Sequence, residues 1–217
     1  MKKLFFKELR LAASPLSFFF LVAGFLTLVP GYPILLGAFF ITLGIFYSFQ
    51  TTRENNDIGF SLLLPIAKKD VVKGKFVFVL FLELSGFLLM IGLTLLRMTV
   101  LSKASVYVSN ALMGANFTFL GLSLLLFGLF NFLFVRGFFK TAYYFGKPFI
   151  LYLVFSLLLV TVSEALHFFP GLSPFFSLGF SPFTPQFSVF LLGLAAFLLL
   201  TVFAARRSEK SFEAIDF

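Results

Sequence analysis

The sequence RENNDIGFSLLLPIAKKDVVKGK, residues 53–75, is the most charge-dense interval of a chain that is otherwise largely apolar. It holds five of the 17 Lys and Arg residues and three of the 9 acidic residues, and it separates two long apolar runs. Its centre is apolar again, because Phe60, Leu63 and Leu64 follow the i, i+3, i+4 spacing of one helix face. The interval therefore predicts a short helix within a charged loop between two membrane spans.

The ends of this short helix are predicted from three residues. Asp57 is expected to be its N-cap, because a short carboxylate accepts hydrogen bonds from the unpaired amides at a helix start. Pro65 is expected to end it, because proline removes an amide donor, and Asp70 is expected to cap the next helix. Lys68 and Lys69 would then precede a helix start, where positive charge is unfavourable. We therefore expect lipid headgroups or an acidic partner beside them.

A helix of about two turns cannot cross a bilayer, which requires roughly 20 residues. Two interpretations of this helix remain open. It can rest on the membrane surface as an amphipathic helix, or it can insert into a groove on a cytosolic protein.

A family resemblance favours the second interpretation. It rests on Asn56-Asp57, Phe60-Ser61, Leu64-Pro65, Lys68, Asp70-Val71-Val72 and Lys75. These residues resemble the cytosolic loop after the second span of ABC-2 type transporter permeases, and within that family the permeases of Gram-positive peptide-toxin exporters of the phenol-soluble modulin type. The sequence departs from the pattern at Leu63-Leu64, where Ser-Leu is usual, and at Lys68, where Arg is common.

The resemblance implies that the loop transmits force from a separate ATPase. The implied coupling residues are Asp57, Ile58, Phe60, Ser61, Leu63, Leu64, Pro65, Lys68, Lys69 and Asp70. It also implies two cytosolic ABC ATPase subunits as partners, and a second permease subunit that is identical or homologous.

Composition independently places the chain among membrane proteins. It is 60% hydrophobic and 12% charged, with a mean hydropathy of +1.05. The net charge of +8 does not indicate nucleic-acid binding, because the basic residues lie in short intervals between apolar runs. The absence of cysteine excludes disulfides and thiolate metal sites.

The hydropathy pattern predicts an all-α, polytopic membrane protein with six transmembrane helices in a single domain over residues 1–217, and the resemblance implies that this is a permease domain. The expected spans are residues 15–29, 33–51, 76–96, 118–135, 148–163 and 187–205. Residues 1–13 are expected to form an interfacial amphipathic helix, with Lys3, Lys7 and Arg10 on one face. A cleaved signal peptide is the rival interpretation, but the following apolar run is too long and no small-x-small site ends it.

Residues 164–186 differ from the rest of the apolar sequence, because four prolines interrupt them. This segment is too apolar for an ordinary solvated loop and too rich in proline for a helix, so we expect a short re-entrant element between spans five and six. Irregular backbone at membrane depth is tolerated only against protein or a wet cavity. The segment also resembles ABC-2 type permeases, which place short re-entrant helices between their fifth and sixth spans.

The distribution of basic residues predicts the orientation. With a cytosolic N-terminus, fifteen Lys and Arg residues lie inside, and only Arg97 and Lys103 lie outside. Both termini and residues 53–75 are therefore expected in the cytosol of a cell with a plasma membrane, which the resemblance implies is bacterial.

The sequence contains no G-x-x-x-x-G-K-[ST] phosphate loop, so we expect no enzyme activity in this chain and expect ATP and Mg²⁺ to bind the partner ATPase. No metal-ligand cluster is recognisable. Glu83 lies well inside a span, so it is a candidate for the wall of a translocation path or for a dimer contact. The alternative is a structural role, in which its carboxylate reaches the inner headgroups or forms a hydrogen bond with Ser85. Glu164 and His167 are weaker candidates for a proton-handling pair, which as readily forms an ordinary interfacial pair.

These observations lead to the prediction of an ATP-driven exporter subunit for an amphipathic peptide or another hydrophobic substrate. Two other classes remain open: an ion- or proton-coupled carrier that uses Glu83, and a non-transporting immunity or anchoring protein of the membrane.

Overall fold

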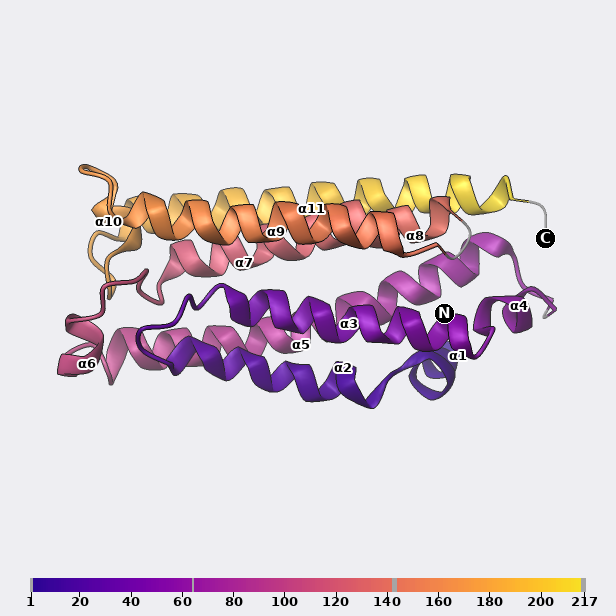
Figure 1. Cartoon of the computed structure of the whole chain (residues 1–217), viewed down its shortest axis with the longest axis horizontal. Coiled ribbons are helices and arrows are strands. Elements are labelled where there is room, and N and C mark those ends of the chain that lie inside the picture. Colours follow the sequence, from indigo (N-terminus) through magenta and orange to yellow (C-terminus); the bar gives the residue numbers. More distant parts are fainter. Residues whose placement is uncertain (1, 64, 142–143, 216–217) are drawn as a thin grey trace.

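The computed structural model describes residues 2–63, 65–141 and 144–215, and these residues form helices and connecting turns without a β-strand. The long helices run side by side in one elongated bundle (Figure 1). Both chain termini lie at one end of the bundle together with α1 and α4, and α6 and α10 lie at the other end (Figure 1). The expected all-α class is therefore confirmed.

The N-terminal part of the bundle ends at the short helix predicted from the charged loop. Its elements are α1 (Lys2–Lys7), the π-helix η1 (Glu8–Ala12), α2 (Pro15–Phe19), the 3₁₀ helix η2 (Phe20–Leu28), α3 (Leu36–Glu54) and α4 (Asp57–Leu62). The axis of residues Lys3–Ala12 is bent by 100° from that of Pro15–Leu28. The N-terminal helix therefore lies across the bundle end, as an interfacial helix would.

The rest of the chain supplies the longest helices. They are α5 (Lys68–Thr99), α6 (Ser105–Val108), α7 (Phe117–Leu129), the π-helix η3 (Phe130–Val135), α8 (Arg136–Lys140), α9 (Gly146–His167), α10 (Ser173–Phe176) and α11 (Phe183–Glu213). The helices α7, η3 and α8 follow one another without a break.

Four helical stretches in the described residues are long and apolar enough to cross a membrane. They are Lys68–Thr99, Phe117–Lys140, Gly146–His167 and Phe183–Glu213, and the bent pair at the N-terminus adds a fifth if it forms one span. The helix α3 has 19 residues but is not among them, because its last turns carry Gln50, Arg53 and Glu54. The chain is thus a multi-pass membrane protein.

The first expected span is wound more tightly than predicted, because nine of its residues form a 3₁₀ helix. A 3₁₀ helix rises about 2.0 Å per residue against about 1.5 Å for an α-helix. Residues 15–28 therefore extend over about 25 Å, most of the ~30 Å apolar thickness of a bilayer. Two side chains satisfy the backbone carbonyls at the end of η2. Arg97 donates a hydrogen bond to the Thr27 carbonyl at 2.6 Å, and Tyr107 donates one to the Leu28 carbonyl at 2.8 Å.

Aromatic packing joins α3 to the second half of the chain. The rings of Phe46 and Phe149 stack at 3.8 Å, and Phe49 contacts Phe134 at 5.0 Å and Phe138 at 4.9 Å between ring centroids. Such contacts suit a bundle in lipid, where close packing rather than exclusion of water holds helices together.

The irregular segment between α9 and α11 is shorter than expected, since α9 continues to His167 and α11 begins at Phe183. It lies at the α6 end of the bundle (Figure 1). The Asn116 side chain donates to the carbonyls of Phe175 at 3.0 Å and Ser177 at 2.9 Å. Protein groups thus satisfy backbone that has no helical partner, which membrane depth would require.

Candidate functional site

The helix α4 reverses the usual arrangement of polar and apolar side chains. Phe60 is 50% exposed and Leu63, which follows the helix, is 85% exposed, whereas Asp57 and Ser61 are buried. Exposed apolar groups beside buried polar ones indicate a contact surface rather than a solvated helix. We call Phe60 and Leu63 the exposed apolar face. The side chains of Ile58 and Leu62 and all of Leu64 lie outside the described residues, so their predicted roles stay predictions.

The buried side of α4 is fixed to the N-terminal helix by Lys7. Its ammonium donates to Asp57 Oδ2 at 3.0 Å and to Ser61 Oγ at 2.7 Å. The Ser61 hydroxyl in turn donates to the backbone carbonyl of Asp57 at 2.7 Å. The exposed fractions of the Lys7 and Asp57 side chains are 11% and 1%, so this is a shielded ion pair.

A second buried ion pair continues from Lys7 toward the long helices. Glu8 Oε1 lies 2.8 Å from Lys7 Nζ, and Glu8 Oε2 accepts from Lys75 Nζ at 2.5 Å. Lys75 also donates to Thr52 Oγ1 at 2.6 Å. We call Asp57, Lys7, Glu8, Lys75 and Thr52 the charged network. It connects α4 and the N-terminal helix to the end of α3 and the start of α5.

The protonation behaviour of the network follows from burial and pairing. Burial alone would raise the pKa of Glu8, but the nearby charges of Lys75 and Lys7, with their hydrogen bonds, outweigh it and hold that pKa below its ordinary value. Burial alone would lower the pKa of Lys7, but the charges of Glu8 and Asp57 and the bonds to them raise it. Both groups are therefore charged near neutral pH.

Both predicted N-caps are wrong. The N-cap of α4 is Asn56, in the left-handed region at φ 47°, and Asp57 is the first helical residue. Asparagine tolerates this conformation better than most residues. The Asp57 carboxylate binds Lys7 instead of a backbone amide, because a charged donor forms the stronger hydrogen bond.

Asp70 lies in the first turn of α5, because that helix already begins at Lys68 after Ala67 as N-cap. Its carboxylate lies 4.0 Å from Lys73 Nζ. Lys68 donates to the backbone carbonyl of Ile215, just beyond α11, at 2.5 Å. Lys69 and Pro65 are exposed. The start of α5 therefore contacts the end of α11 through Lys68, and the anion expected beside Lys68 and Lys69 stays a prediction.

Glu83 is fully buried within the single chain, between α5, η3 and α11. Asn131 Nδ2 donates to Glu83 Oε2 at 3.0 Å and to Thr201 Oγ1 at 3.1 Å. Ser85 donates to the Phe81 carbonyl at 2.6 Å rather than to Glu83. The π-helix η3 carries Asn131, and such helices occur often at functional sites. The role predicted for Glu83 in transport stays a prediction.

Glu164 and His167 share the last turns of α9 but form no ion pair within the described residues. Glu164 Oε2 accepts from the Met113 amide at 3.0 Å, and the His167 ring packs against Phe168 and Phe176, at 5.2 and 6.2 Å between centroids. Glu164 thus fixes the loop before α7. Across the described residues, no cluster of His, Asp or Glu could hold a metal ion.

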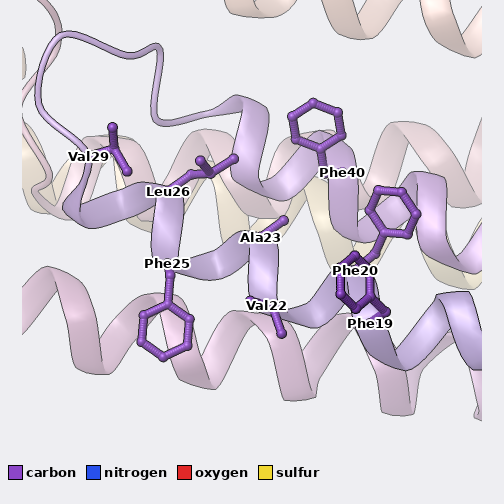
Figure 2. Close-up of a pocket in the computed structure, with 8 residues that line it drawn as sticks. All are labelled: Phe19, Phe20, Val22, Ala23, Phe25, Leu26, Val29 and Phe40. Atoms are coloured by element: carbon purple, nitrogen blue, oxygen red, sulfur yellow. The ribbon is translucent and has the colours of Figure 1, made fainter.

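The helix η2 borders an apolar groove of about 410 Å³ (Figure 2). It is lined by Phe19, Phe20, Val22, Ala23, Phe25, Leu26, Val29 and Phe40. Phe25 and Val22 point to one side of η2, and Leu26 points to the other (Figure 2). None of the lining side chains is polar, so this groove suits lipid chains or another apolar helix and not a small polar ligand.

Sequence reasoning missed part of the network. It assigned Lys7 to a basic helix face and Lys75 to the loop motif, and it assigned no role to Glu8 or Asn131. The available signals were slight: Glu8 is the one acidic residue in residues 1–13, and Asn131 is the one amide in the apolar residues 117–135.

The comparison with known families supplies the identity of the fold. The chain matches the family described as ABC-2 family transporter protein over residues 3–212, nearly its full length. No curated protein and no solved structure matches it. The match agrees with the apolar helices long enough to span a membrane. The chain therefore belongs to the ABC-2 transporter family, whose members are the membrane permease subunits of ABC transporters.

Proposed function

We propose that this chain is the permease subunit of an ATP-driven exporter and that two cytosolic ATPase subunits bind it at α4. A second permease, identical or homologous, completes the transporter. We propose six membrane crossings. The first is formed by α2 together with η2, and the second by α3. The chain lacks a phosphate loop, so ATP and Mg²⁺ belong to the ATPase subunits.

One observation carries this proposal: α4 exposes Phe60 and Leu63 while Lys7 holds its opposite side through Asp57 and Ser61. A helix that is fixed on one side and apolar on the other suits insertion into a protein groove. Two neighbouring grooves enlarge this surface, one of about 260 Å³ lined by Leu11, Asn55, Asp57 and Phe60 and one of about 450 Å³ lined by Lys3, Phe6, Lys7, Arg10 and Leu11.

The charged network offers a path for the force. When the ATPases close on ATP, they push α4, and Lys7 passes the displacement to Glu8. Glu8 is bonded to Lys75 at the start of α5, and Lys75 is bonded to Thr52 near the end of α3. Buried ion pairs resist separation, because removal of one partner leaves an uncompensated charge. The ends of α3 and α5 therefore move together with α4.

The proposed cargo is an amphipathic peptide or another hydrophobic molecule. The groove beside η2 offers apolar side chains without convergent polar groups, which a sugar or an ion would need. Residues 168–182, which include the short helix α10 and lie at the far end of the bundle, are proposed as the outer re-entrant element.

The test is co-purification of this chain with a co-expressed ABC ATPase that carries a Walker motif and no spans of its own. Replacing both Phe60 and Leu63 by Glu should abolish retention of the ATPase in detergent and the ATP hydrolysis that accompanies it. The matched control replaces Val106 and Val108, which are 55% and 67% exposed at the other end of the bundle, by Glu. If the variant with Glu at Phe60 and Leu63 retained the ATPase as well as the variant with Glu at Val106 and Val108, the docking site would be refuted.

Transport by the Glu83→Gln variant distinguishes the exporter from an ion-coupled carrier. Glu83→Gln keeps the volume of the side chain and can still accept from Asn131, so the exporter account predicts near-normal transport and ATP hydrolysis. A carrier that moves a proton through this carboxyl would lose transport in the same variant.

A further inference from the structure

Two grooves meet on α11 at the end of the bundle that carries the chain termini. One, of about 630 Å³, is lined by Phe132, Leu198, Leu199, Leu200, Val202, Phe203 and Arg206. The other, of about 520 Å³, is lined by Lys69, Phe203, Arg206, Arg207, Glu209, Lys210 and Glu213. Because they share Phe203 and Arg206, they form one surface, which we call the α11 groove.

The apolar part of the α11 groove faces outward and has the depth of one lipid leaflet. Leu199 is 72% exposed, and Leu198 and Val202 are about half exposed. The distance along the helix from Leu198 to Arg206, eight positions later, is about 12 Å at ~1.5 Å per residue. Half of the apolar thickness of a bilayer is about 15 Å. An acyl chain of the leaflet at this end can therefore lie along α11 as far as Arg206.

The polar part of the α11 groove is positively charged. Its lining carries four cations, Lys69, Arg206, Arg207 and Lys210, against two carboxylates, Glu209 and Glu213. Within the described part of the chain, neither carboxylate forms an ion pair with these cations. The positive charge at the polar end is therefore available to an anion.

Aromatic rings hold two guanidinium groups at the junction of the two parts. The Arg207 guanidinium lies 5.2 Å from the centroid of the Phe203 ring. The Arg136 guanidinium lies 5.0 Å from the Phe132 ring and 5.7 Å from the Phe203 ring. Stacking restricts these side chains while their N–H groups stay able to bind a phosphate.

We propose that the α11 groove binds one anionic phospholipid, with an acyl chain against Leu198, Leu199 and Phe203 and the phosphate among Arg206, Arg207 and Lys69. Basic pockets beside apolar helix faces recognise such headgroups. An anionic phospholipid suits the groove better than a second permease copy or an apolar peptide. Either of those would cover the apolar part but leave the positive charges of the polar part without a counterion. The site requires no ATPase, so it stands or fails apart from the docking at α4.

The chain contains no tryptophan, so one introduced tryptophan reports on its neighbouring lipid. Leu199→Trp is placed in the full chain, reconstituted in phosphatidylcholine vesicles, and its fluorescence is quenched with brominated phosphatidylglycerol or brominated phosphatidylcholine. We expect phosphatidylglycerol to bind beside Trp at least about fivefold more tightly, the size expected from one basic side chain near the surface.

The matched reporter is Val154→Trp on α9. Val154 is 58% exposed and lies seven residues from Lys147, as Leu199 lies seven residues from Arg206. It should show a smaller preference for phosphatidylglycerol than Leu199→Trp, because one cation, Lys147, stands where the α11 groove has four. In the Leu199→Trp chain, replacing Arg206 and Arg207 by Gln should remove the preference, and Lys147→Gln should leave it unchanged.

Three results would overturn the proposal. Equal preference at both reporters would indicate diffuse attraction of anionic lipid. No preference at Leu199→Trp would show that the groove does not select the headgroup. Absence of quenching by either lipid at Leu199→Trp, with normal quenching at Val154→Trp, would show that protein covers the groove.

Discussion

Lys75 illustrates how a single charged side chain can fix the end of a membrane bundle. It is 1% exposed, and its ammonium binds Glu8 and Thr52 while it lies 5.3 Å from the centroid of the Phe49 ring. Three elements therefore depend on one cation. Since burial makes a charge costly unless it is paired, loss of either partner should affect the whole network.

We predict that Lys75→Met destabilises the protein by about 3–5 kcal/mol, because Glu8 keeps a buried charge with one partner fewer. The control is Lys73→Met. The Lys73 and Asp70 side chains are 43% and 39% exposed, and such a pair contributes about 0–1 kcal/mol. Unfolding of the purified chains in detergent measures both. Equal losses would show that the buried network has no special role.

The network also predicts how stability depends on pH. The pKa of Glu8 is lower in the folded chain than in the unfolded one, so its stabilisation is complete above the ordinary value of 4.5 and is lost as the pH falls through the folded pKa. The pKa of Lys7 is raised, so its contribution is present below 10.5 and is lost as the pH rises through the folded pKa. Stability should therefore be greatest between these limits.

Glu8→Gln tests the acidic limit. The unmodified chain should lose more stability between pH 7 and pH 4 than the variant loses, because near and below 4.5 the unfolded chain binds a proton at Glu8 that the folded chain resists. Thermal unfolding at the two pH values gives the comparison. A fall of the same size in both chains would place the acid sensitivity elsewhere.

At the scale of elements, α7 and α11 approach through glycine. A Cβ added at Gly193 would lie 2.1 Å from the Gly121 carbonyl oxygen, which is backbone and cannot turn aside. Small residues allow this approach in membranes, where close packing supports association. The glycines therefore set the distance between α7 and α11.

Gly193→Ala should thus destabilise the bundle by about 1–3 kcal/mol, since the two helices must separate to admit the methyl group. Gly92→Ala is the control, because a Cβ there would meet no atom within 4 Å. That control should be neutral or stabilising by up to about 1 kcal/mol, the usual gain from alanine in a helix. Unfolding in detergent measures both, and a neutral Gly193→Ala would contradict the packing described here.

The sequence predicted the helices more reliably than the contacts between them. Long apolar runs, the first interrupted by Glu83, located residues 76–96 and 187–205 inside α5 and α11, because the requirement for apolar side chains is strictly local. The partners of Asp57, Glu8 and Glu83 lie 50, 67 and 48 positions away. No pattern within one helix contains that information, so the caps were assigned wrongly and the network was missed.

At the scale of the whole molecule, the charged end and the loop-rich end predict an orientation. The end with α4 and both termini should face the cytosol by the positive-inside rule. The chain has no cysteine, so Leu63→Cys and Val108→Cys each introduce a single thiol. An impermeant maleimide should label only Val108→Cys in intact cells and only Leu63→Cys in inverted vesicles stripped of peripheral proteins. The reverse pattern would invert the proposed topology.

The docking of an ATPase at α4 is the central claim, and photo-crosslinking from residue 63 tests it most directly. A benzophenone attached to Leu63→Cys should join the chain to a subunit that carries a Walker motif, and the same group at Val108→Cys should not. Crosslinks from residue 63 only to lipid, or only to other helices of the same chain, would contradict the account.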